Sequence, residues 1–167
     1  LYVKSIEEFK TGRSGAVNYV STLKKIWQKN PDDLDAKAFF IAEVWSRNFH
    51  NHFGYTGLTS RERNMPLYEL AKEILAVNPL HPVHHYVIHM WDNKEDFELG
   101  LESADINGFA GPKVAHMWHM QGHTYSQANL PFDTWWSQEA SARVDHAYMR
   151  ELNVFPFMLH NHAHNNE

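Results

Sequence analysis

The stretch from Ala16 to Asp33, AVNYVSTLKKIWQKNPDD, decides the fold class. Apolar residues recur at Val20, Leu23 and Ile26, a three-residue spacing that places them on one face of an α-helix. The Asn-Pro-Asp-Asp at the end of the stretch stops this helix, and its proline and acidic residues suit the first turn of the next one. We therefore expect a helix over 16–29, a short turn, and a second helix that reaches about residue 48.

The same alternation of helical stretches and short breaks continues to the end of the chain. Gly, Pro and Asn mark the breaks, and sustained period-two alternation, the sign of strands, is absent. The predicted fold class is therefore all-α, with about eight helices. The later helices are expected over about 65–77, from 82, over 95–107, 114–127 and 132–152, and from about 155.

The helices read as pairs with a period of about 34 residues, which is the length of a tetratricopeptide repeat. The two segments of the sequence that resemble each other most are residues 78–104 and 110–142. We predict antiparallel helix pairs stacked as a tetratricopeptide-like α-solenoid, although a four-helix bundle would give a similar pattern. Residues 1–167 are expected to form one domain, with less regular repeats over 1–75 and histidine-rich repeats over 76–167. The chain begins without Met and ends without a capping helix, so we expect it to belong to a longer protein.

Composition narrows the classes of partner and of chemistry. The net charge is −5 with neutral histidine, and no basic stripe is visible, so nucleic acid is not an expected partner. No apolar run reaches the roughly 18 residues that a membrane-spanning helix needs, so no membrane contact is expected. The chain has no cysteine, which excludes disulfides, thiolate metal ligands and a cysteine nucleophile. The cellular location stays open.

Histidine is the unusual residue of this sequence. It occurs 13 times in 167 residues, several times the roughly 2% of an average soluble protein. Most of the histidines fall in three separated groups, and within each group several share one face of an expected helix. These one-face sets are His81, His85 and His89; His116, His119 and His123; and His160 with His164. His50, His52 and His146 lie outside the groups and are interpreted as structural or peripheral.

Imidazole is the commonest ligand of transition metals, and two histidines four residues apart on a helix can chelate one ion. Equivalent helices of stacked repeats lie side by side, so the three histidine faces should converge. We therefore predict a transition-metal site with a pool of six ligands, which are His85, His89, His119, His123, His160 and His164.

The metal is expected to be copper or zinc, with iron also compatible with nitrogen ligands. Met90, Met117 and Met120 stand beside the histidines and would favour copper, although ordinary core packing also explains them. Whether such a site is redox-active, hydrolytic or not catalytic at all is left open. Candidate hydrogen-bonding partners for the ligands are Asp92, Glu139, Asp145, Asn161, Asn165 and Glu167.

A second reading is that the chain is a protein-interaction or self-assembly scaffold. The histidines would then form a polar, hydrogen-bonded core that joins the helices, or a pH-sensitive interface. Uncapped ends of a repeat stack could bind a protein partner or further copies of the chain. A metal requires nitrogens from several helices to point at one place, whereas a scaffold predicts rings that bond separately to nearby acceptors.

Three strings carry a resemblance to a known family: His85-Tyr86-Val87-Ile88-His89, residues 116–125 (HMWHMQGHTY), and His160-Asn161-His162. In this order they resemble the His-Tyr-x-Ile-His, His-Met-Pro-x-His-Ile-Tyr and His-Asn-x-His strings of a group of bacterial tetratricopeptide-repeat proteins. The resemblance covers about residues 75–167. It implies an all-α repeat fold and implies no particular activity.

Overall fold

The computed structural model describes residues 7, 13–49, 57–159 and 162–166, and every regular element within those ranges is helical. This confirms the predicted all-α fold class. The chain divides into two compact units, Leu1–Pro79 and Leu80–Glu167. The division lies close to residues 75–76, where the sequence separates less regular repeats from histidine-rich ones. The stacking of both units as one tetratricopeptide-like domain stays a prediction.

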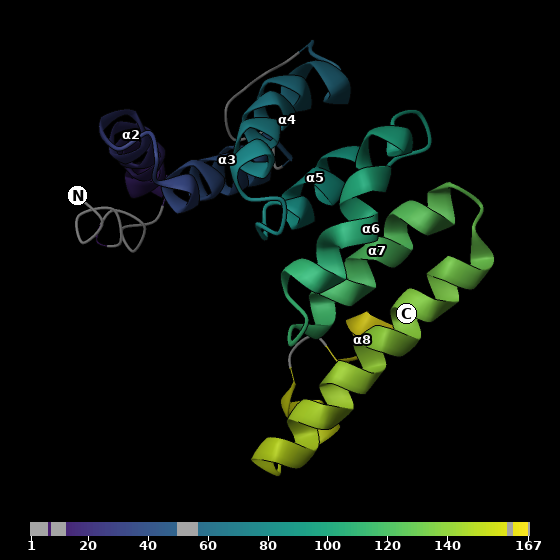
Figure 1. Ribbon diagram of the computed structural model, residues 1–167. Coiled ribbons are helices and arrows are strands. Elements are labelled where there is room, and N and C mark those ends of the chain that lie inside the picture. Colours follow the sequence, from purple (N-terminus) through teal and green to yellow (C-terminus); the bar gives the residue numbers. More distant parts are fainter. Residues whose placement is uncertain (1–6, 8–12, 50–56, 160–161, 167) are drawn as a thin grey trace. The chain divides into compact units, whose positions relative to one another are not determined.

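The first unit contains three described helices in which each packs on the next (Figure 1). They are α2 (Arg13–Lys29), α3 (Leu34–Phe49) and α4 (Ser60–Val77). The apolar face expected from the opening stretch is buried, since Leu23 and Ile26 form a core cluster with Ala36 of α3. A salt bridge joins α3 to α4, with Nζ of Lys37 2.8 Å from Oε2 of Glu73.

Helix α4 begins five residues earlier than the sequence pattern predicts. A capping box explains the difference: Thr59 Oγ1 accepts a hydrogen bond from the Glu62 backbone N–H at 3.2 Å, and Glu62 Oε2 accepts one from the Thr59 N–H at 2.7 Å. These two bonds satisfy backbone donors at the start of the helix. The helix then continues through Pro66 to Val77.

The second unit is built from four helices that pack in chain order, and α5 also contacts α7 (Figure 1). They are α5 (His84–Trp91), α6 (Leu101–Ala110), α7 (Ala115–Gln127) and α8 (Pro131–Leu152), with a short 3-10 helix η1 (Phe97–Gly100) before α6. The contact of α5 with α7 matters most for function, because it brings two of the predicted histidine faces together.

The apolar core of the second unit lies between α5, α6 and α7. Ile88, Ala104 and Met120 are fully buried there, and Tyr125 packs against them. Met120 is therefore core filler, which is the second of the two interpretations given for the methionines. The crossing of α6 and α7 needs a glycine at 108, because a Cβ there would collide with the ring of Trp118.

The end of the chain does not form the predicted eighth helix. The structure shows two short 3-10 helices instead, η2 (Pro156–Met158) and η3 (His164–Asn166). Residues 159–167, LHNHAHNNE, are rich in His and Asn, which are poor helix formers. Tertiary contacts decide the local shape, because η3 packs on both α7 and α8 and buries Asn165 (2% exposed).

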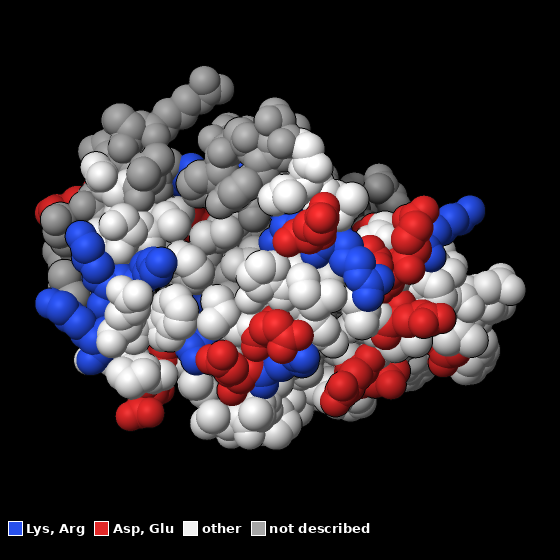
Figure 2. All heavy atoms as spheres, turned by 90° about the horizontal axis from the view of Figure 1, so that it is seen from above, with Lys and Arg blue, Asp and Glu red and all other residues white. Residues whose placement is uncertain are grey.

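On the face drawn in Figure 2, acidic and basic side chains both occur, and neither sign covers it continuously. Among the described helices, none is both long enough and apolar enough to cross a membrane.

Candidate metal centre

Helix α5 carries the first pair of histidines. His85 and His89 are four residues apart, so the helix places their rings on one face, and their Nε2 atoms lie 3.1 Å apart. The other ring nitrogen of His85, Nδ1, is buried and has no hydrogen-bond partner within the described part of the chain. Two nitrogens bound to one ion at 2.0–2.1 Å are about 2.8–3.4 Å apart for angles of about 90–110° at the ion. The pair therefore has the spacing of a chelate.

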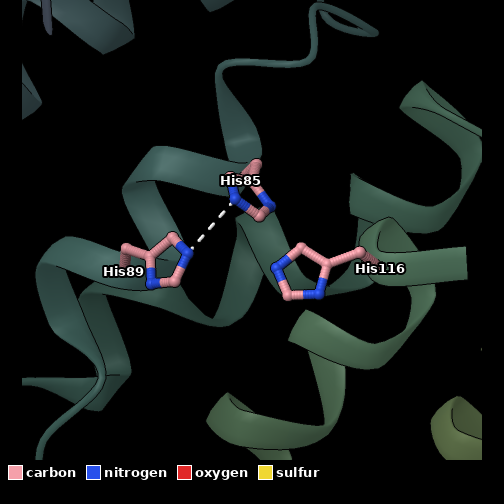
Figure 3. A group of neighbouring side chains, drawn as sticks. All are labelled: His85, His89 and His116. Carbon is pink, nitrogen blue, oxygen red and sulfur yellow. Dashed lines mark hydrogen bonds between the residues drawn. The ribbon is translucent and has the colours of Figure 1, made fainter. Parts of the chain in front are cut away.

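His116, in the first turn of α7, completes a group of three. The ring nitrogens with which His85, His89 and His116 could bind an ion all lie within 4.8 Å of one another. Figure 3 shows the three rings facing one another, two from α5 and one from α7. This group could hold a metal ion.

A second group lies further along α7 and uses the end of the chain. His116, His119 and His164 also have ring nitrogens within 4.8 Å of one another. His123 belongs beside them, because its Nε2 lies 3.0 Å from Nε2 of His119. Helix α7 thus carries a second i,i+4 pair with nearly the same nitrogen spacing as the pair on α5.

Side-chain oxygens hold the Nδ1 atoms of the α7 histidines. Nδ1 of His116 lies 3.2 Å from Oδ1 of Asn165, Nδ1 of His119 lies 2.7 Å from Oε1 of Gln138, and Nδ1 of His123 lies 2.8 Å from Oδ2 of Asp92. Amide and carboxylate oxygens accept hydrogen bonds, so these contacts place the proton on Nδ1. The Nε2 atoms then carry the lone pairs with which a histidine binds a metal, and ligating histidines are commonly held in this way.

The contact at His116 extends to a buried carboxylate. Asn165 accepts from His116 through Oδ1 and donates through Nδ2 to Oδ2 of Asp145 at 3.2 Å. The same carboxylate oxygen lies 3.1 Å from Nδ1 of His162. Asp145 is 8% exposed, so its charge acts on the Asn165 amide through a medium that screens it less than water does.

Burial lowers the pKa of four of the clustered histidines, which are His85, His89, His116 and His119. Burial, followed by the charges that the neighbouring histidines would carry, lowers the pKa of His85 to about 3 and that of His89 to about 4. Burial likewise lowers the pKa of His119 to about 4, against an opposing hydrogen bond from Gln138. The pKa of His116 is lowered too, and burial is again the largest cause. Near neutral pH these rings therefore offer lone pairs rather than positive charges.

Other histidines of the second unit serve the fold. Nδ1 of His81 accepts a hydrogen bond from the backbone N–H of Val83 at 3.1 Å, just before α5 starts. His84 is 2% exposed, and its Nδ1 lies 2.9 Å from the Ser103 hydroxyl. These are the separate, locally bonded rings that a polar core predicts, and they lie outside the two groups.

The structure brings five of the six predicted ligands together. His85 and His89 lie in the first group, His119 and His164 in the second, and His123 directly beside His119. The sixth, His160, lies outside the described residues. His116, which both groups share, was not in the predicted pool even though its helical phase with His119 and His123 was visible in the sequence.

The predicted hydrogen-bonding partners divide in a similar way. Asp92, Asp145 and Asn165 contact histidines or each other, as expected. Glu139 pairs with Arg143 instead, and Asn161 and Glu167 lie outside the described residues. Gln138 is the functional residue that the sequence interpretation missed, since only the packing of α8 on α7 places it next to His119.

A pocket opens beside the second group. Its volume is about 270 Å³, just below the range of roughly 300–1,000 Å³ usual for drug-sized ligands. His119, His123 and His164 contribute to its wall, and the remaining lining is mainly polar. These lining residues are Asp92, Gly122, Ser126, Gln127, Thr134 and Gln138.

Comparisons with protein-family models, with curated proteins and with solved structures find no match for this chain.

Proposed function

We propose that the second unit binds a transition-metal ion through His85, His89 and His116. The observation that carries the proposal is the convergence of three ring nitrogens, from two helices, to within 4.8 Å. Three histidines leave a fourth position of a tetrahedral ion for water or a substrate, which is the ligand number of catalytic zinc sites. Nitrogen ligands suit zinc and copper, and also iron.

The low pKa values of the first pair support the same proposal. His85 and His89 stay neutral to low pH, so protons do not compete strongly for their Nε2 lone pairs. An ion chelated between the two Nε2 atoms would bind a lone pair of each ring in place of the present contact between them.

The deciding experiment is metal analysis of the purified chain after loading with Zn(II) or Cu(II) and dialysis. We expect at least one ion per chain in the wild type, and one ion fewer in the double variant His85→Ala/His89→Ala. His146→Ala is the matched control, because His146 is exposed and lies outside both groups, and it should retain the wild-type content. Less than one ion per wild-type chain, or full content in the double variant, would contradict the proposal.

A self-assembly surface is the second candidate, and exposed aromatic residues favour it. Helix α8 presents Phe132, Trp135 and Trp136 with exposed fractions of 70%, 58% and 49%. Large clustered apolar side chains on a surface commonly mark protein contacts. Sedimentation of the wild type should then show concentration-dependent association that Trp135→Ser/Trp136→Ser abolishes. A monomer at all concentrations would exclude this candidate without affecting metal binding.

A further inference from the structure

We infer that the second unit holds two metal ions, the second one chelated by His119 and His123 with His164 as the third ligand. This rests on the proposed function, since it adds a second position beside the His85–His89–His116 position. Each ion would then have one i,i+4 pair and one single histidine. The six rings form a continuous cluster in which each lies 4.5–5.1 Å from its nearest neighbour, measured between ring centroids, and His116 joins the two halves at 5.6 Å from His119.

The pair on α7 is arranged as a chelate. Gln138 and Asp92 hold the two Nδ1 atoms, so both Nε2 lone pairs point into the 3.0 Å space between His119 and His123. Two neutral rings in this state repel each other unless a cation or a proton lies between them. The spacing falls within the range of about 2.8–3.4 Å expected for two nitrogens on one ion.

His164 completes the second position from the end of the chain. Its ring centroid lies 4.5 Å from that of His119 and 6.4 Å from that of His123. His164 is exposed, so its side chain has room to adjust toward an ion. His116 is the ring between the two positions, 5.1 Å from His85 and 5.6 Å from His119. Because Asn165 holds its Nδ1, His116 offers only Nε2 and serves one ion at a time.

Each position has one negative charge behind its ligands. Asp92 contacts His123 directly, and its hydrogen bond to that ring is the largest of the causes that lower its pKa. Asp145 acts on His116 through the Asn165 amide. Carboxylates in such places raise the basicity of ligating histidines and fix their rings. The two positions are therefore similarly equipped, although their carboxylates come from different elements.

The second position borders a pocket through which an external ligand can reach it. His119, His123 and His164 all line the pocket of about 270 Å³, whereas the pocket lining includes neither His85 nor His89. The polar wall, with Thr134 and Gln138 among its residues, suits water or a small ligand that binds through oxygen.

A proton on His123 is the competing explanation for the short contact with His119. Asp92 would stabilise that positive charge, and the protonated Nε2 would donate to Nε2 of His119. The two explanations differ in metal content, because a protonated pair binds no ion. They are separated by counting ions per chain.

The test is the zinc content of the full chain, loaded with Zn(II) alone and dialysed, as wild type, His85→Ala/His89→Ala, His119→Ala/His123→Ala and the His146→Ala control. We expect two ions in the wild type and control, and one ion in each double variant. Because His119 is 3% exposed and its loss could unfold the unit, His164→Ala provides a milder variant. It should keep the helical circular-dichroism spectrum and weaken one of the two zinc equivalents at least tenfold.

Three results would overturn the two-ion arrangement. One ion in the wild type that persists in His119→Ala/His123→Ala leaves the proposed function intact and removes the second position. One ion that disappears in either double variant means that both pairs share a single ion. No bound zinc or copper in the wild type removes both the second position and the proposed function.

Discussion

The two histidine pairs of the second unit have the same spacing in sequence and nearly the same spacing in space, but different surroundings. On α5 the Nε2 atoms of His85 and His89 lie 3.1 Å apart, and on α7 those of His119 and His123 lie 3.0 Å apart. The α7 pair has both Nδ1 atoms on side-chain oxygens, whereas Nδ1 of His85 is buried without a partner.

This difference separates two ways of preparing a metal ligand. The α7 pair is oriented before any ion arrives, and its anchors offset the cost of burying polar rings. At His85 only Nε2 has a hydrogen-bond partner, which is Nε2 of His89, so no side chain fixes this ring from its Nδ1 side before an ion binds. Substitutions of the residues that hold Nδ1 should therefore lower metal affinity at the α7 pair. Substitutions that remove a ring of the α5 pair should change the free energy of unfolding of the metal-free protein.

The largest expected effect is acid destabilisation of the metal-free protein, driven by the α5 pair. The folded-state pKa values of His85 and His89, about 3 and about 4, lie below the value of 6.5 that the unfolded chain has. Between these values the unfolded state binds protons that the folded state does not bind. The stability present above about pH 6.5 is therefore lost as the pH falls toward 4. Each such histidine lowers the free energy of unfolding by up to about 1.4 kcal/mol for each unit by which the pH falls.

Urea denaturation of the metal-free chain at several pH values between about 7 and about 5 measures this slope. His85→Leu/His89→Leu should make it shallower, leaving the part due to His116 and His119, and His146→Ala should leave it unchanged. An equal slope in the double variant would show that the α5 pair is not the source of the acid sensitivity.

The second effect compares the two carboxylates behind the α7 histidines. Asp92→Asn removes a charge that contacts His123 directly, so zinc affinity at the second position should fall about tenfold. Asp145→Asn acts on His116 only through Asn165, and we expect a loss of about threefold or less. Competition with a zinc chelator measures both. Equal losses would mean that the relayed carboxylate matters as much as the direct one.

The sequence predicts much of this fold because helical spacing is a local property. The positions of Leu23 and Ile26 on one face are visible without any structure, and both are buried as expected. In the described residues, the α-helix expected from about 155 is replaced by the 3-10 helices η2 and η3, for a reason that lies outside the local pattern: the side chain of Asn165 is bound between Asp145 and His116. The start of α4 could have been predicted, because Thr59 and Glu62 have the spacing of a capping box.

The candidate site was predicted in part for the same reason. An i,i+4 pair such as His119 and His123 is visible as soon as a helix is assigned. Of its two partners, Asp92 was among the candidates from the sequence, whereas Gln138 was not, because it belongs to α8 and only tertiary packing places it at Nδ1 of His119. His116 was left out although its phase was known, since its role depends on facing α5 as well as α7.

The third effect is a change in the free energy of unfolding, which should have opposite signs when one histidine of each pair is replaced by leucine. His85→Leu removes a buried nitrogen without a partner, so the metal-free protein should gain about 1 kcal/mol of unfolding free energy. His119→Leu leaves Oε1 of Gln138 without its donor, and should cost about 1 kcal/mol. Leucine also favours a helix slightly more than histidine does at both sites, which cancels in the comparison. Urea denaturation at neutral pH decides the signs, and two changes of equal sign would refute the distinction between the pairs.

The smallest effect comes from a residue that touches no ion. A Cβ at Gly122 would lie 2.5 Å from Nε2 of Gln138, so Gly122→Ala must push the end of that side chain away from His119. Alanine raises helix stability by about 0.5–1 kcal/mol, so unfolding free energy should not fall, while zinc affinity at the second position should drop about threefold. Gln138→Ala is the matched variant: it should give a similar loss of affinity, and the two changes together should cost no more than either alone. Additive losses would show that Gly122 acts on the site by a route other than Gln138, and the anchoring of His119 would then not explain why α7 has glycine there.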